Sequence, residues 1–278
     1  MSHYERYDQR AGDYDTTRSA IGSEIWLGNL ISHFGSLADI RVLDAGCGTG
    51  NYTFALAQHV RHVTAIDANQ QMLLEARRKA AQKELVQKVT IEIGSLPELP
   101  FGDNSFDAVM FNQVLHHLEP LGPTEFKNHR AALLEASRVL RRGGIVLISG
   151  CSRRQMSGGF WYHALIPDAR SRALARTIGS QELRHALREA GFERISRTVP
   201  LDALIQGDAS LDANGPLDPG WRAGDSVWAL ATDVELETAL ARCRELQRTG
   251  ALEGFMHKHD RRRNAVGQTT FWTAVQSS

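Results

Sequence analysis

Residues 41–50, R-V-L-D-A-G-C-G-T-G, constrain the fold more than any other stretch of this chain. A short apolar run ends at Asp44, and glycine then occupies every second position, at Gly46, Gly48 and Gly50. Glycine permits a positive φ angle and lets a ligand approach the backbone closely, because it has no Cβ. The residues that follow have helical character. A strand, a glycine loop and a helix in this order predict an α/β fold that binds a nucleotide-like ligand at the carboxyl end of a parallel sheet.

The spacing of the glycines distinguishes two ligand classes. A dinucleotide loop, G-x-G-x-x-G, would need glycine where this chain has Asn51, which argues against a NAD-dependent oxidoreductase. The pattern D-x-G-x-G-x-G resembles motif I of the class I S-adenosylmethionine (SAM)-dependent methyltransferases, in particular the small-molecule group related to the ubiquinone and menaquinone C-methyltransferases. The resemblance implies that Asp44, Gly46, Cys47 and Gly48 bind the cofactor. It also implies a Rossmann-like, doubly wound, seven-stranded α/β sheet with an antiparallel last strand and a helical cap.

A second acidic residue ends the next apolar stretch, V-T-A-I-D. Asp67 lies 21 positions after Gly46, close to the interval at which Rossmann-like folds present a carboxylate to ribose. An ionised carboxylate accepts two hydrogen bonds from a vicinal diol, so we expect Asp67 to bind the ribose. The alternative is an N-cap of the helix that follows. Ala68 is expected beside the cofactor, and Met72 either under the adenine or in the core.

Two more stretches resemble this family. A-G-D-Y-D matches its N-terminal A-x-x-Y-D signature, which implies that Tyr14 closes over the methionyl end of SAM; simple packing is the alternative. After V-T-I-E-I-G at residues 89–94 the family usually has an acid for the adenine amino group, where this chain has Ser95. The hydroxyl of Ser95 and the backbone of Leu96 are expected to make that contact without charge.

After the glycine loop, the stretch most specific to this family is 99–118, which contains F-G-D-N-S-F-D-A-V-M-F-N-Q. It predicts a strand whose end presents Asn112 and Gln113, where the backbone of relatives receives the SAM ammonium group. His117 follows at the start of a predicted helix. It is a candidate pocket residue or general base that faces the reacting methyl group.

Beyond this point two insertions are expected to form the substrate cap, because insertions at the carboxyl ends of strands lie over the ligand crevice. The first contains the aromatic run F-W-Y-H at 160–163. These side chains are expected either to line a wall beside the sulfonium or to form the core of the cap. Tyr162 and His163 are therefore further candidates for the general base.

The chain is expected to form a single methyltransferase domain over residues 1–278. R-R-G-G at 141–144 predicts a glycine-capped helix end, and an amphipathic helix is predicted over 233–248. Residues 268–275 alternate like an edge strand, and the resemblance implies that they are the last strand of the sheet, inserted antiparallel. The predicted parts are N-terminal cap helices at 1–35, the SAM-binding core at 36–150, substrate-cap insertions at 151–180 and 201–267, and the end of the core sheet at 181–200 and 268–278.

The composition limits which partners and which compartment can be expected. Lys and Arg together number 32, as do Asp and Glu, and a zero net charge argues against nucleic acid or an anionic membrane as partner. Three widely spaced cysteines fit no metal site, and three arginines directly after H-K-H-D at 257–260 disfavour a cation there, so no metal is expected. Without a signal segment or a membrane span, the chain is expected to be cytoplasmic, as a monomer or homodimer.

The predicted function is transfer of the SAM methyl group to a carbon, nitrogen or oxygen atom of a small molecule, with S-adenosylhomocysteine (SAH) as product. One alternative is a SAM-binding protein of the same fold with a non-methylating role, such as a pericyclase or a regulatory partner. A nucleic-acid or protein methyltransferase is a further alternative. The tetrapeptide of adenine-methylating enzymes is absent, since N-Q-V-L stands at its position.

Overall fold

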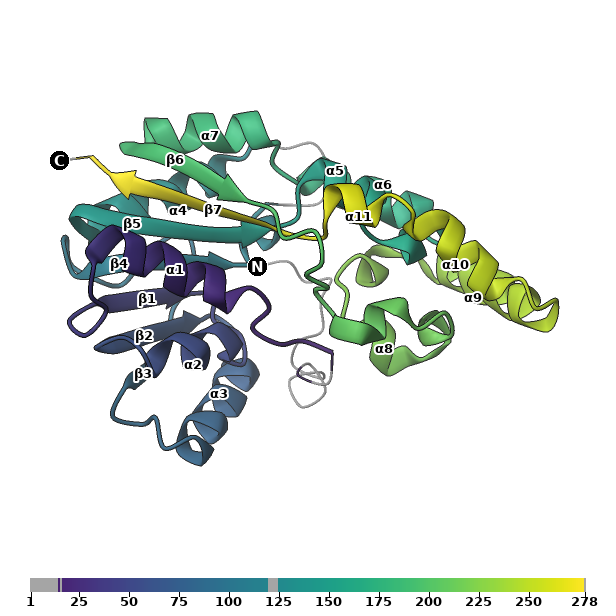
Figure 1. The fold of residues 1–278 in the computed structure, drawn as a ribbon, viewed down its shortest axis with the longest axis horizontal. Helices are drawn as coiled ribbons and strands as arrows, with labels where there is room; N and C mark the ends of the chain where they lie inside the picture. Colours follow the sequence, from purple (N-terminus) through teal and green to yellow (C-terminus); the bar gives the residue numbers. More distant parts are fainter. Residues whose placement is uncertain (1–14, 16, 120–124, 278) are drawn as a thin grey trace.

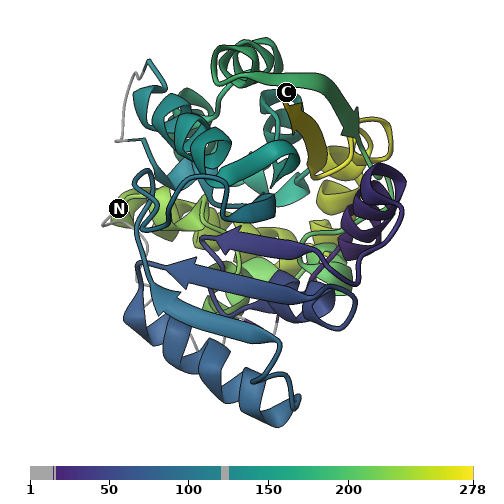
Figure 2. The same ribbon diagram turned by 90° about the vertical axis from the view of Figure 1, so that its left-hand side faces the viewer.

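The computed structural model describes residue 15 and residues 17–119 and 125–277. These residues form one seven-stranded sheet in the order β3-β2-β1-β4-β5-β7-β6 (Figures 1 and 2). Neighbouring strands pair in parallel from β3 through β2, β1 and β4 to β5. Strand β7 pairs antiparallel with both β5 and β6, which confirms the predicted fold class. The strands are β1 (Arg41–Ala45), β2 (His62–Asp67), β3 (Val89–Ile93), β4 (Phe106–Asn112), β5 (Leu140–Gly150), β6 (Phe192–Thr198) and β7 (Thr270–Gln276).

Helices cover both faces of the sheet and form a separate cap beyond one end of it (Figure 1). The α-helices are α1 (Ser23–Phe34), α2 (Asn51–Ala57), α3 (Gln70–Gln82), α4 (Lys127–Val139), α5 (Arg153–Gly158), α6 (Pro167–Arg176), α7 (Ser180–Glu189), α8 (Pro219–Ala223), α9 (Asp233–Arg248), α10 (Leu252–Asp260) and α11 (Arg263–Val266). The 3₁₀ helices are η3 (Leu115–His117), η4 (Trp161–Ala164), η5 (Gly207–Leu211), η6 (Gly215–Leu217) and η7 (Trp228–Leu230). The predicted helix over 233–248 is confirmed as α9. None of the helices in the described ranges is long and apolar enough to span a membrane.

Two apolar cores flank the sheet. Helices α4 and α7 pack on one face, and α1, α2 and α3 pack on the other. Trp26 and Leu30 of α1 are fully buried in the second core, and the Trp26 indole donates a hydrogen bond to Asn112 Oδ1 at 2.8 Å. The α1 part of the expected N-terminal cap therefore packs on the sheet itself and supports the end of β4.

One local prediction is wrong and another is confirmed. R-R-G-G does not end a helix: α4 stops at Val139, and Leu140 is already extended, fully buried and paired with Phe106. Burial of that leucine in the sheet begins β5 early and leaves the glycines inside the strand. The last strand predicted over 268–275 is confirmed as β7, which is inserted antiparallel between β5 and β6. Its aromatic side chains alternate between the two cores, Phe271 in one and Trp272 in the other.

The cap has an apolar core of its own. Helices α6, α9 and α10 contribute to it, and α9 and α10 project away from the sheet (Figure 1). The aromatic run 160–163 lies within this region: Trp161 and Tyr162 are almost completely buried, and Phe160 stacks on His163 with ring centroids 4.8 Å apart. Most side chains of this run therefore belong to the core of the cap, which was one of the two alternatives expected from the sequence.

Candidate functional site

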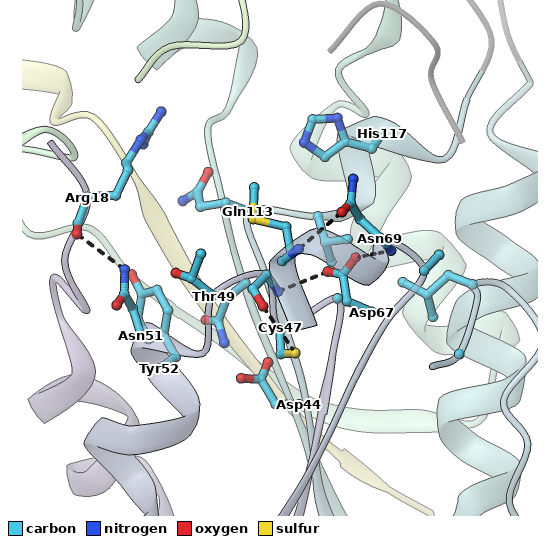
Figure 3. Close-up of a pocket in the computed structure, with 18 of the residues that line it drawn as sticks. Arg18, Asp44, Cys47, Thr49, Asn51, Tyr52, Asp67, Asn69, Gln113 and His117 are labelled. Carbon is cyan, nitrogen blue, oxygen red and sulfur yellow. Dashed lines mark hydrogen bonds between the residues drawn. The ribbon is translucent and has the colours of Figure 1, made fainter. Parts of the chain in front are cut away.

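A cavity of about 780 Å³ lies where β1, β2 and β4 end (Figure 3). Tyr14 is outside the described residues. Every other predicted cofactor residue lines the cavity, although their contact with a cofactor remains a prediction. These residues are Asp44, Gly46, Cys47, Gly48, Asp67, Ala68, Met72, Ser95, Leu96, Asn112 and Gln113.

The glycine loop exposes its backbone to this cavity. Gly46 has a φ of +84°, and a Cβ built there would lie 2.4 Å from Val114 Cγ2. Its amide donates to the carbonyl of Ile66 at 2.8 Å, which holds the loop against β2. Gly48 has a φ of +54° and no atom within 4 Å of an added Cβ. The loop therefore needs glycine at Gly46 for backbone and packing reasons, and at Gly48 it leaves open space for a ligand.

Asp67 connects the glycine loop to the segment after β2 (Figure 3). Its Oδ2 accepts from the Gly48 amide at 2.9 Å, and its Oδ1 accepts from the Asn69 amide at 2.8 Å. Burial raises the pKa of Asp67, although these amide bonds oppose the rise. The N-cap alternative is wrong, because Asn69 caps α3 by accepting from two amides of its first turn. Asp67 is thus held in place at the cavity wall and retains lone pairs for a diol.

Asp44 is a buried carboxylate, 1% exposed, at the end of β1. Its Oδ2 accepts from the Thr53 hydroxyl at 2.6 Å, and its Oδ1 has no hydrogen-bond partner among the described residues. Burial raises the pKa of Asp44 to about 6, although the hydrogen bond from Thr53 and the nearby Asn112 amide oppose the rise. An unpartnered buried carboxylate oxygen is unfavourable, and a ligand that brings a cationic N–H group would satisfy it.

A polar network that the sequence analysis missed supports the loop. Lys79, 8% exposed, reaches from α3 and donates to Asp15 Oδ2 and Asn51 Oδ1, both at 2.6 Å, and to the Thr49 hydroxyl at 3.2 Å. Asp15 Oδ1 in turn accepts from Thr49 and Asn51, at 2.7 and 2.9 Å. The network ties the N-terminal segment to the end of the glycine loop. The sequence signal that could have predicted this network is the pair of polar residues on either side of Gly50, Thr49 and Asn51, which the glycine motif does not explain.

A smaller chamber of about 80 Å³ adjoins the large cavity. Both cavities are lined by Arg18, Gln113, His117 and Ile205, so they meet at these residues. Burial, together with the guanidinium groups of Arg176 and Arg18, lowers the pKa of His117 to about 3. The His117 imidazole is therefore neutral at physiological pH and lies at the junction of the two spaces.

The other two candidate bases lie in the cap. His163 lines the small chamber only. Tyr162 lines neither cavity: it is fully buried, with its hydroxyl 2.9 Å from both Gln206 Oε1 and Asp225 Oδ2. Burial and the carboxylate of Asp225 hold the pKa of Tyr162 well above its usual value. The structure thus brings His117 and His163 to the site and leaves Tyr162 behind it.

Known proteins resemble this chain in sequence and in fold. Residues 43–148 match the family described as "Methyltransferase domain". A demethylmenaquinone methyltransferase of Staphylococcus aureus is 34% identical over 140 residues, which cover 48% of this chain and 54% of the relative. The chain thus spans about half the length of the curated relatives it matches.

Two solved structures share the fold over most of the chain. A putative methyltransferase from an antibiotic biosynthesis pathway of Anabaena variabilis superposes with a TM-score of 0.71 at 21% identity, over 93% of this chain and 99% of that one. The [4+2]-cyclase SpnF superposes with a TM-score of 0.58 at 21% identity, over 91% and 80% of the two chains. At such identities the likeness establishes the fold alone.

Proposed function

We propose, from the premise that residues 43–148 form a class I SAM-dependent methyltransferase domain, that this chain transfers the methyl group of SAM to a small-molecule acceptor. The observation that carries the proposal is the convergence of a glycine loop, the buried carboxylate of Asp44 and the partly buried carboxylate of Asp67 on one cavity. Its volume of about 780 Å³ falls in the range of cofactor pockets. Methyl transfer would leave SAH as product.

The residues present fit the cofactor. The unpartnered Oδ1 of Asp44 would accept from the cofactor's ammonium group, and Asp67 would accept from its ribose hydroxyls. The open backbone at Gly48 would let the cofactor approach without a steric clash. When bound, SAM supplies a methyl group that its sulfonium makes electrophilic. The chain's own contribution is then mainly to align the acceptor and exclude water.

Calorimetric titration with SAM and, separately, SAH tests the proposal, with NAD as the control ligand. Binding of both sulfur ligands with a Kd of about micromolar order, and none of NAD, is the expected result. Failure of both SAM and SAH to bind would contradict the proposal. Binding of both without any SAH production from a broad acceptor panel would favour the non-methylating alternative, a role for which the fold of SpnF provides a precedent.

SAM affinity is expected to rise about tenfold between pH 5 and pH 7 and then level off, since Asp44, with a pKa of about 6, is mostly protonated at pH 5. Burial raises this pKa, so the carboxylate that attracts the ammonium forms only as the pH rises through 6. The cofactor's own α-ammonium group, with a pKa of about 7.7–8, remains charged across this window. Calorimetry at several pH values measures the effect. Asp44→Asn should bind more weakly and with a flat profile, and a slope that persists in this variant would assign the titration to another group.

A further inference from the structure

Four side chains near the carboxyl ends of the central strands share one face of the sheet. Asp44 of β1 lies opposite Met110 of β4, and Asn112 of β4 lies opposite Ser149 of β5. Residues two positions apart on a strand point to the same face, as do residues opposite each other on paired strands. The carboxylate of Asp44 and the amide of Asn112 are therefore on the same face, and both residues line the large cavity.

The hydrogen bonds to the Asn112 amide fix its orientation. The indole N–H of Trp26 can only donate, and it lies 2.8 Å from Asn112 Oδ1, so the atom of the amide on this side is the oxygen. The Ser149 hydroxyl donates to the same oxygen at 3.2 Å. All three residues are buried, and a buried amide oxygen without a donor would be unfavourable. The amide nitrogen is therefore directed away from Trp26.

The amide nitrogen lies on the side of Asp44. Asn112 Nδ2 is 3.7 Å from Met110 Sδ, and Met110 is the residue opposite Asp44 on the neighbouring strand. Burial raises the pKa of Asp44, and the Asn112 amide is one of the groups that oppose this rise. An N–H group beside a carboxylate has this effect, whereas a carbonyl oxygen in the same place would repel the anion. The orientation of the amide thus favours the ionised form of Asp44.

We propose that Trp26 is a positioning residue for the cofactor site. Its indole holds the Asn112 amide with the N–H group toward Asp44, which keeps that carboxylate available as an anion for the cofactor's ammonium group. This inference rests on the proposed methyltransferase function and deepens it. Helix α1, which the glycine motif does not include, thereby influences how the cavity binds the amino-acid part of its ligand.

Other charged and titratable groups also act in this cavity. The carboxylate of Asp67 raises the pKa of Asp44, although less than burial does. Lys79 of α3 contacts the glycine loop through the Thr49 hydroxyl. The remaining titratable side chains that line the cavity are Arg18, Cys47, Tyr52 and His117. A substitution at Trp26 or Asn112 replaces none of these groups, so a changed pH profile would report on the Asn112 amide.

The test is the pH dependence of SAH binding to the full chain, measured by calorimetry at pH 6 and pH 7.5. Asn112→Leu, similar in shape but without an N–H group, should raise the ratio of the Kd at pH 6 to the Kd at pH 7.5 about fourfold, as a one-unit rise in the pKa of Asp44 would. Trp26→Phe keeps an aromatic ring for the edge-on contact with Phe271. It should raise the same ratio about twofold, as a half-unit rise would. The ammonium group of SAH titrates alike in every variant and cancels from the comparison.

Two controls separate positioning from general damage to the cavity. The ligand 5′-methylthioadenosine has the adenosine and the thioether of SAH but no amino-acid part, so it offers no ammonium group to Asp44. Its Kd for Trp26→Phe should stay within about twofold of the unaltered protein at both pH values. Trp228→Phe is the matched variant, because Trp228 is buried in the core of the cap and its Nε1 has no hydrogen-bond partner among the described residues. It should leave the SAH profile unchanged.

An unchanged SAH profile in folded Trp26→Phe would overturn the inference. An equal loss of affinity for SAH and 5′-methylthioadenosine at both pH values would overturn it as well, because Trp26 would then act through packing only. Where Trp26→Phe fails to fold, Ser149→Ala takes its place, since it removes the second donor to the same oxygen. Failure of the unaltered protein to bind SAH would overturn the proposed function and this inference together.

Discussion

Asp67→Ala is expected to weaken SAM and SAH binding by about 3 kcal/mol, more than a hundredfold in Kd, because hydrogen bonds to a charged group are lost. The substitution also removes the acceptor that holds the Gly48 amide at 2.9 Å, so the loop loses its link to β2. Calorimetric titration with both sulfur ligands measures the change. An affinity within twofold of the unaltered protein would rule out Asp67 as a ribose ligand.

Two further measurements separate ligand binding from loop support. Asp67→Asn retains one acceptor oxygen and should lose less affinity than the alanine variant. Urea unfolding of the ligand-free proteins should differ little, because relief of the buried charge, seen in the raised pKa of Asp67, offsets the lost amide bonds. A fall in unfolding free energy as large as the fall in binding would identify Asp67 as a loop support only.

Gly46→Ala is expected to lower the free energy of unfolding by about 2–4 kcal/mol, the sum of a positive-φ penalty and overpacking. The backbone there has a φ of +84°, and the new methyl group would lie 2.4 Å from Val114 Cγ2. The branched side chain of Val114 has few rotamers with which to move away. Urea denaturation of the ligand-free protein measures the effect.

Gly48→Ala is the matched comparison. It shares the positive φ, at +54°, but an added methyl group would meet no atom within 4 Å. Its stability loss should be about 1–2 kcal/mol, the backbone penalty alone, while SAM binding should weaken because the methyl group enters the cavity. Adding Val114→Ala to Gly46→Ala should recover only that part of the lost unfolding free energy that comes from overpacking. Equal stability losses at Gly46 and Gly48 would contradict this assignment.

The fold and the part of the cavity around the glycine loop were predictable because their signals are local. A short apolar run followed by Asp44 or Asp67 marks the end of a parallel strand, and such ends meet at one edge of the sheet. The structure places both carboxylates at the same cavity for this reason.

The cap side of the cavities was less predictable because its contacts are between residues far apart in the sequence. Asp225 approaches His163 and Tyr162 across some sixty positions, in a cap whose 3₁₀ turns carry no strong periodicity. Aromatic spacing alone did not distinguish Tyr162, which packs behind the site, from His163, which faces it. Likewise, R-R-G-G has the composition of a helix end, but burial of Leu140 in the sheet overrides that local preference.

The Lys79 network has a practical consequence for any shortened form of this protein. Asp15 is the acidic partner of an ammonium group that is otherwise almost enclosed, next to the loop that would hold the cofactor. A truncation that removes Asp15 would leave that charge, among the described residues, with the neutral oxygens of Thr49 and Asn51 as its partners. Residues that lie before the first helix would then determine how well a trimmed chain expresses, and whether its ligand site survives purification.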